Sequence, residues 1–173
     1  MDIACHVFIN TFFISKKLRD DVKLHFLFYG APDPPKHLEF QPSKQLENVQ
    51  KKIDISKKDI AGLIKKLLYK YKPGTKNEVA PGYWIEKKNL FDVLDELKEQ
   101  GKEVYVLDSK GEDIRDMKIS KDCVFLLGDH EGLPAKELKR LRKQLIPVSV
   151  GPKMLFASQV VTIVSNELDR LGI

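Results

Sequence analysis

The sequence has few cysteines and no long apolar run, and both shortages exclude whole classes of protein. Cys5 and Cys123 stand alone in apolar stretches of a 173-residue chain, so neither a disulfide framework nor a C-x-x-C zinc site is expected. We expect both thiols to be buried. The longest uncharged apolar run, residues 3–15, is shorter than the roughly 20 residues that span a bilayer, and Asp2 stands where a signal peptide needs positive charge. The sequence therefore predicts a cytoplasmic protein without a membrane segment.

Several catalytic motifs are also missing. There is no G-x-G-x-x-G, no Walker A pattern and no G-x-S-x-G, so the common dinucleotide, nucleotide and serine-hydrolase sites have no support. Asp129, His130 and Glu131 are adjacent residues that point in different directions on a turn, and no H-E-x-x-H spacing occurs, so no metal is expected. With 42% apolar and 32% charged residues, the composition is typical of one globular domain over residues 1–173.

Apolar runs that alternate with amphipathic segments predict an α/β fold. Helices are predicted over residues 3–14, 57–71 (capped by Ser56), 90–100 (capped by Asn89 and ended by Gly101), 136–144 and 155–171. Strands are predicted over residues 22–29, 103–107, 123–127 and 146–150, and residues 31–36 are predicted to be an extended proline-rich loop. The last three strands are nearly all apolar, which is typical of central parallel strands covered on both faces.

Positive charge is concentrated in the first half of the chain. Residues 1–72 hold 14 lysines and arginines against 8 acidic residues, whereas residues 73–173 hold 16 against 17. A one-sided basic surface favours a polyanionic partner. A lysine-rich face that is simply solvated remains the alternative.

Glycines follow the predicted parallel strands where ligands bind in such sheets, beyond the carboxyl ends. Gly128, Gly132 and Gly151 allow close backbone approach there. The same glycines also fit ordinary strand-to-helix turns, so spacing alone leaves both readings open.

Several motifs in order resemble a known family. Residues 127–134 (LGDHEGLP), 148–152 (VSVGP) and 157–170 (ASQVVTIVSNELDR) are similar to those of the archaeal tRNA pseudouridine-54 N1-methyltransferases, members of the SPOUT superfamily of knotted methyltransferases. Upstream segments 2–5, 12–15, 18–20, 32–36 and 111–113 agree as well. The resemblance covers nearly the whole chain.

The resemblance implies a parallel α/β sheet with a C-terminal deep trefoil knot, a rare exception to unknotted topology, and a homodimer. It also implies that the knot loops bind S-adenosylmethionine. The cofactor-binding residues expected from the family's motifs are Leu107, Gly128, Ser149, Val150, Gly151, Met154, Leu155 and Val160.

The implied reaction moves a methyl group to N1 of pseudouridine in tRNA, on a base flipped out of the folded loop. Asp2 resembles the aspartate of an Arg-x-Asp motif in a related family and is the expected proton acceptor, with capping of the first helix as its alternative role. The residues expected to contact the RNA backbone are Arg19, Asp20, Lys36, Lys57, Lys58, Lys65 and Lys66. A local Arg19–Asp20 ion pair is the competing interpretation.

The sequence departs from the family in two places. The family begins earlier, with a strand and the arginine of Arg-x-Asp, whereas this sequence starts at Met1. Either the start codon is placed late or the strand and its arginine are missing. Val160 and Ser165 stand where relatives tend to carry Cys and His. Two alternative functions follow: a knotted RNA-binding protein without catalysis, or a pseudouridine methyltransferase of ribosomal RNA.

Overall fold

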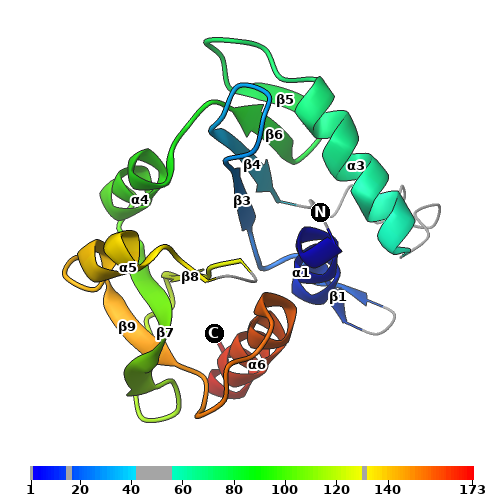
Figure 1. Ribbon diagram of the computed structural model, residues 1–173. Helices are drawn as coiled ribbons and strands as arrows, with labels where there is room; N and C mark the ends of the chain where they lie inside the picture. The colour runs from blue at the N-terminus through cyan, green and yellow to red at the C-terminus, as the bar shows by residue number, and fades with distance from the viewer. Residues whose placement is uncertain (1, 15–16, 42–55, 130–131) are drawn as a thin grey trace. The chain divides into compact units, whose positions relative to one another are not determined.

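The computed structural model describes residues 2–14, 17–41, 56–129 and 132–173 (Figure 1). These residues form two compact units, Met1–Val93 and Leu94–Ile173. The single-domain organisation expected from the chain length stays a prediction. No helix in the described ranges is both long and apolar enough to cross a membrane.

The first unit is built on an antiparallel sheet. Its elements are α1 (Asp2–Phe12), β1 (Phe13–Ile14), β2 (Lys17–Leu18), β3 (Leu24–Phe28), β4 (Lys36–Phe40), α3 (Lys57–Tyr69), β5 (Asn77–Ala80), β6 (Tyr83–Glu86) and the start of α4 (Leu90–Glu99). Strands β1 and β2 form a short antiparallel pair, and the larger sheet has the order β3-β4-β6-β5. The predicted strand at 22–29 is confirmed as β3, which pairs with β4 in an antiparallel sheet.

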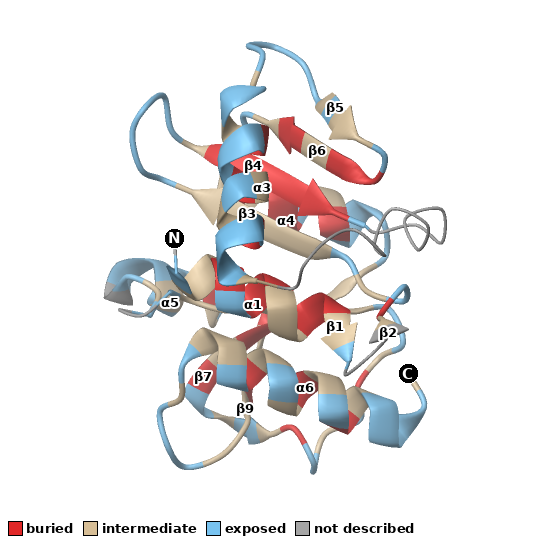
Figure 2. Cartoon of the chain, turned by 90° about the vertical axis from the view of Figure 1, so that its right-hand side faces the viewer, coloured by how far each residue is buried: buried red, intermediate tan, exposed pale blue. Residues whose placement is uncertain are grey.

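Two helices pack on one face of this sheet. Phe8 and Phe12 of α1 and Ile64 of α3 are buried in one apolar cluster with Leu38 and Phe40 of β4. Figure 2 shows the result, with β4 buried along its length and α3 buried on one side only. His37 and Glu39 of β4 lie on the sheet's other face, because residues alternate between the two faces of a strand.

The local signals for α3 and α4 are confirmed. The Ser56 hydroxyl accepts a hydrogen bond from the Asp59 N–H at 3.2 Å, and the Asn89 side chain accepts bonds from Phe91 and Asp92. Gly101 ends α4 with a φ of 78°. The predicted loop at 31–36 ends one residue early, because Lys36 is already paired in β4.

The second unit contains the parallel sheet. Its elements are the remainder of α4, β7 (Glu103–Asp113), β8 (Cys123–Leu126), α5 (Ala135–Leu141), β9 (Ile146–Ser149) and α6 (Ala157–Leu171). The strand order is β8-β7-β9 and both pairings are parallel. The predicted parallel sheet is thus confirmed here, although β8 and β9 are mostly half-buried rather than fully covered.

Strand β7 pairs with β9 twice. Val148 of β9 is the partner of Leu107 and again of Glu112, so residues 108–111 leave the ladder between two stretches of pairing. At the crossing, a Cβ on Gly111 would lie 2.5 Å from the Val148 nitrogen and 2.6 Å from the Pro147 carbonyl carbon. Only glycine permits that backbone-to-backbone approach.

Helix α6 packs against the sheet through one side. Val160 and Val164 share an apolar cluster with Tyr105 of β7 and Val148 of β9. Burial raises the pKa of the Tyr105 hydroxyl to about 12, with the Glu103 hydrogen bond adding to the effect. Tyr105 is therefore neutral and acts as a packing residue with a satisfied polar end.

Candidate functional site

The ends of the three parallel strands meet at one edge of the sheet. Strands β7, β8 and β9 run in the same direction, so the segments after Leu107, Leu126 and Ser149 lie at the same carboxyl edge. This is where open parallel sheets bind ligands. We take this edge as the candidate site of the second unit.

A tight turn follows β8. A Cβ on Gly128 would lie 2.5 Å from the Gly132 carbonyl carbon and 2.6 Å from the Leu133 nitrogen, so glycine is required where the turn closes. The Gly132 N–H donates to the Asp129 carbonyl at 3.1 Å, and Gly132 has a φ of 80°. His130 and Glu131 lie outside the described residues, and no group of three metal-ligating residues occurs in the described part of the chain.

A second turn follows β9. The Ser149 hydroxyl accepts a hydrogen bond from the Gly151 N–H at 3.2 Å and lies 3.1 Å from the Gly151 carbonyl. Gly151 has a φ of 139°, a conformation that side-chain-bearing residues rarely adopt. The serine thus shapes its own loop.

The structure brings four of the expected cofactor-binding side chains together. Leu107, Val150 and Leu155 are half-buried against the cluster that contains the buried Val160. These four side chains form an apolar surface, and Val150 directly precedes the glycine of the second turn. Met154 differs, because it is 92% exposed and lies outside the cluster.

An anchored carboxylate lies at the same edge. The Asp108 side chain is only 3% exposed and pairs with Arg142, while also accepting from the Lys110 N–H at 3.0 Å. The Arg142 hydrogen bond lowers the pKa of Asp108. Sequence reasoning marked the Leu107–Asp108 strand end but missed Arg142, whose position in a basic helix gave no sign of a specific partner.

The expected RNA-contacting residues divide into two groups. Arg19 and Lys36 are buried, whereas Asp20 is exposed. The Arg19 guanidinium lies 3.4 Å from Asp21, and the Lys36 amine donates to the Pro32 carbonyl above the Tyr71 ring. The second group is exposed on α3 and consists of Lys57, Lys58, Lys65 and Lys66.

Asp2 lies in the first turn of α1, where the helix dipole stabilises a carboxylate. Its carboxylate is exposed and lies 2.7 Å from the Lys57 amine. That hydrogen bond lowers the pKa of Asp2. The same contact ties Lys57 to the end of α1.

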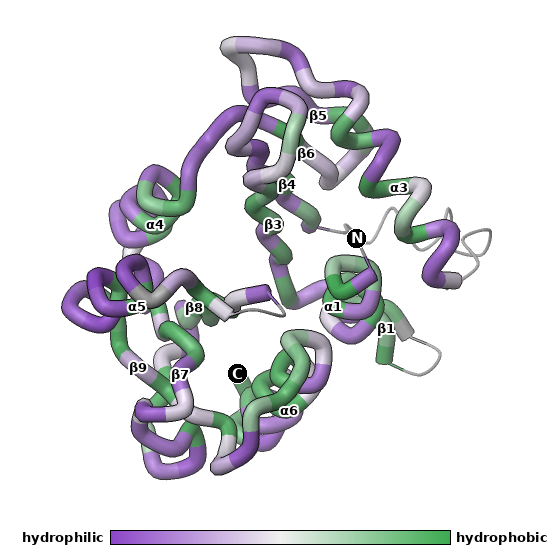
Figure 3. The backbone as a smooth tube through the Cα atoms, in the orientation of Figure 1, coloured by the Kyte–Doolittle hydropathy of each residue, from purple (hydrophilic) through white to green (hydrophobic). Residues whose placement is uncertain are grey.

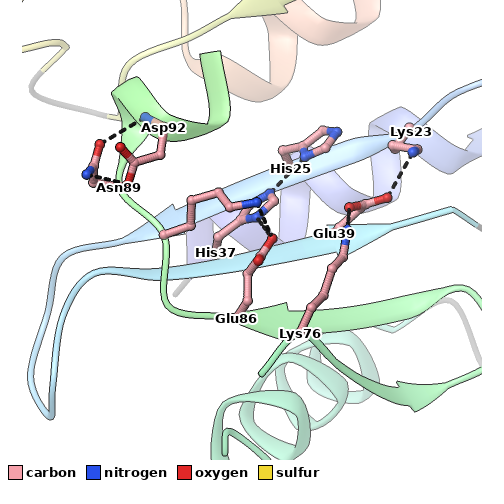
Figure 4. Close-up of polar contacts among 9 residues, drawn as sticks. Lys23, His25, His37, Glu39, Lys76, Glu86, Asn89 and Asp92 are labelled. Atoms are coloured by element: carbon pink, nitrogen blue, oxygen red, sulfur yellow. Dashed lines mark hydrogen bonds and ion pairs between the residues drawn. The ribbon is translucent and has the colours of Figure 1, made fainter. Parts of the chain in front are cut away.

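The polar face of the antiparallel sheet holds a network that sequence reasoning missed (Figure 4). His25 Nδ1 lies 2.8 Å from His37 Nε2, and His37 Nδ1 lies 3.0 Å from a Glu86 oxygen. A carboxylate accepts, so His37 donates from Nδ1 and accepts from His25 at Nε2. Beside it, Glu39 pairs with Lys23 at 2.8 Å and Lys76 at 2.6 Å.

Burial controls the charges in this network. Desolvation lowers the pKa of His25 to about 4, with His37 adding to the effect, and it also lowers the pKa of His37 against the opposing Glu86 bond. For Glu39, burial raises the pKa but the bonds from Lys23 and Lys76 together outweigh it, giving about 2. At neutral pH both histidines are therefore neutral and Glu39 is ionised.

The two cysteines differ in burial. Cys5 is buried as expected, whereas Cys123 is half-buried. Desolvation raises the pKa of both thiols, which keeps them protonated and unreactive.

Comparison with known proteins covers the whole chain. The chain is 36% identical to the tRNA (pseudouridine(54)-N(1))-methyltransferase of Methanococcus aeolicus, over 98% of this chain and 84% of the relative. It is 33% identical to the enzyme of the same name from Methanococcoides burtonii, over 98% of this chain and 83% of that protein.

A solved structure resembles the fold. The crystal structure of Archaeoglobus fulgidus Nep1 bound to S-adenosylhomocysteine covers 98% of this chain and 69% of its own, with a TM-score of 0.52 and 17% identity. At that identity the likeness supports the α/β fold alone.

A family model described as "Putative SAM-dependent RNA methyltransferase" matches residues 1–173. The match is as long as the chain and agrees with the relatives above 30% identity. The chain therefore belongs to this family of SAM-dependent RNA methyltransferases.

Proposed function

We propose that this protein transfers the methyl group of S-adenosylmethionine to N1 of pseudouridine 54 in tRNA. The observation that carries the proposal is the near-full-length similarity to enzymes named for that reaction. The glycine turns at the carboxyl edge of the parallel sheet supply a site of the expected kind. A tRNA substrate also favours a cytoplasmic location.

The strand-end site fits the cofactor. Half-buried Leu107, Val150 and Leu155 offer an apolar surface for an adenine, and the turns at Gly128 and Gly151 present main-chain groups to polar edges. We assign cofactor binding to these residues with Ser149 and Val160. Met154 is exposed, so we assign it a contact that forms when ligand is present.

When bound, S-adenosylmethionine supplies a methyl group on a positively charged sulfur, which is already a good leaving group. The protein's task is then to position the acceptor and to take the proton from N1. Asp2 is our proposed proton acceptor. Because the Lys57 bond lowers its pKa, the carboxylate becomes a stronger base only when Lys57 turns toward another anion.

The double pairing of β7 with β9 supports the proposed trefoil knot. Leu107 and Glu112 both pair with Val148, and Gly111 lies against the β9 backbone. A segment that passes a strand so closely between two pairings is what threading requires.

The test is a single-turnover assay with labelled S-adenosylmethionine and T-loop tRNA. Matched transcripts carry pseudouridine or uridine at position 54, and a pseudouridine-containing ribosomal fragment competes. We expect methyl on N1 of pseudouridine in the tRNA only, located by mass spectrometry. Cofactor binding without transfer to any RNA would favour a non-catalytic RNA-binding protein. Preferred methylation of the ribosomal fragment would identify ribosomal RNA, and not tRNA, as the substrate.

A matched pair of variants links transfer to the site. Gly151→Val forces a side chain into a φ of 139° and is expected to abolish cofactor binding by calorimetry. Gly74→Val introduces the same side chain at a φ of 77° in the first unit and controls for strain alone. Equal loss of cofactor binding in both would contradict the assignment.

A further inference from the structure

The outer face of α3 carries an unusual set of side chains. At helical spacing, Lys58, Gly62, Lys65 and Tyr69 fall on one line, with Lys66 beside it. We call these five residues the α3 stripe. All five are exposed; Figure 2 shows the exposed side of α3, and Figure 3 shows its mainly hydrophilic outer residues beside the apolar ones.

Tyr69 is the aromatic end of the stripe. Tyr69 is 85% exposed, whereas Tyr83 and Tyr105 are buried in the two cores. Neither packing nor a hydrogen bond within the described residues explains an open ring at this position. An exposed aromatic face beside cations is the arrangement on which proteins stack unpaired bases.

Gly62 is the second unusual residue. It lies in the interior of α3, where glycine is a poor helix former. A Cβ there would meet nothing within 4 Å, and its φ is not in the positive range. The described structure thus gives no internal reason for glycine, while its small size lets an external backbone approach the helix closely.

Among the residues that the structure describes, no ion pair compensates the charge on the stripe. Lys57 pairs with Asp2, and the nearby acid Asp59 is bonded to Ser56 at the start of the helix. No ion pair within the described residues involves Lys58, Lys65 or Lys66. Three lysines around a glycine are complementary to a phosphate backbone.

We propose that the α3 stripe binds an unpaired segment of the substrate RNA, with phosphates seated over Gly62 between the lysines and one base stacked on Tyr69. This inference rests on the proposed function, which supplies RNA as the partner, and it adds a base-stacking position. An acidic protein would use the lysines but gain little from the open ring and the glycine.

The test measures binding of the pseudouridine-containing tRNA by fluorescence anisotropy across a salt series. For Tyr69→Ala we expect affinity to fall about tenfold with an unchanged salt slope, because stacking is lost and no charge changes. Tyr69→Phe should bind like the parent. For Lys65→Gln with Lys66→Gln, the slope of log affinity against log salt should fall by roughly 1.4 to 1.8.

Gly62→Gln separates folding from binding. Glutamine is a better helix former, so the melting temperature should rise while RNA affinity falls. Lys118→Gln with Lys121→Gln removes two exposed lysines near the start of β8 and is the charge-matched control. Cofactor binding by calorimetry confirms that each variant is folded.

The outcomes distinguish the two proposals. Stripe-dependent RNA binding without methyl transfer would overturn the proposed function and keep the stripe. Transfer together with parental RNA binding in the Tyr69→Ala and Gly62→Gln variants would overturn the stripe alone. Loss of binding in the lysine variants but not in these two would identify a general polyanion surface and overturn the base-stacking site, and a parent that binds no RNA would overturn both.

Discussion

Single residues decide where the backbone can pass in the second unit. Gly111 lies against the Val148 and Pro147 backbone, where no flexible side-chain end can move aside. Gly111→Ala should therefore cost about 2 kcal/mol or more in the free energy of unfolding, because it overpacks a rigid contact. Urea titration measures this loss.

Gly62→Ala is the matched control, since its Cβ meets nothing within 4 Å. It should stabilise the protein by up to about 1 kcal/mol through helix propensity. Equal effects of the two substitutions would contradict the crossing at Gly111.

The His25–His37 pair predicts acid sensitivity. The folded state keeps His25 neutral to a pKa of about 4, whereas the unfolded chain binds that proton near pH 6.5. The contribution of neutral His25 to the free energy of unfolding is therefore fully present above pH 6.5. It is lost as the pH falls toward 4, by at most about 1.4 kcal/mol per pH unit for each proton. Glu39, with a pKa of about 2, adds a second loss below pH 4.5.

Urea midpoints at pH 7.5, 5.5 and 4.5 check this behaviour. The double variant His25→Gln with His37→Gln should show a flat midpoint between pH 7.5 and 5.5, where the parent declines. Parallel curves for the two proteins would show that the acid sensitivity comes from other groups.

At the scale of elements, α3 depends on its first turn. Ser56→Ala removes the acceptor for the Asp59 N–H and should destabilise the protein by about 1 kcal/mol. Ser56→Asp retains an acceptor and should stay near the parent. Thermal melting compares the three, and a Ser56→Ala midpoint equal to the parent would contradict the capping role.

The sequence predicted elements whose signals are local. Caps and stop signals located α3 and α4, and runs of apolar β-branched residues located the parallel strands. Strands β4, β5 and β6 were missed because each is short and mixes polar with apolar residues, so their pairing depends on partners distant in sequence. Pro81–Gly82, where Gly82 has a φ of 80°, was the available signal for the β5–β6 turn.

The candidate site was predicted unevenly for the same reason. Glycines at strand ends are visible in the sequence, and their turns are present. Residue type does not reveal burial, so Arg19 and Lys36 were grouped with the exposed lysines although internal partners hold both. The Glu86–His37–His25 chain joins three strands, and only the antiparallel register places them together.

At the scale of the whole molecule, we predict a homodimer. Phe156 is 65% exposed and follows the exposed Met154 at the start of α6, so apolar surface is available beside the proposed cofactor site. Light scattering should give twice the chain mass of 19.9 kDa. Phe156→Ser should shift the protein toward the monomer, whereas Tyr69→Ser should not; a parent that is monomeric at high concentration would contradict this prediction.

The crossing at Gly111 also sets an order of events during protein synthesis. Leu107 and Glu112 both pair with Val148, and the ribosome adds Val148 after both of them. Until β9 emerges, the second half of β7 lacks its pairing partner, and the carboxyl edge of the sheet lacks one of its three strands. A nascent chain that stops before Ile146 therefore contains most of its residues but lacks part of the proposed cofactor site, and it leaves Tyr105 and its apolar neighbours uncovered.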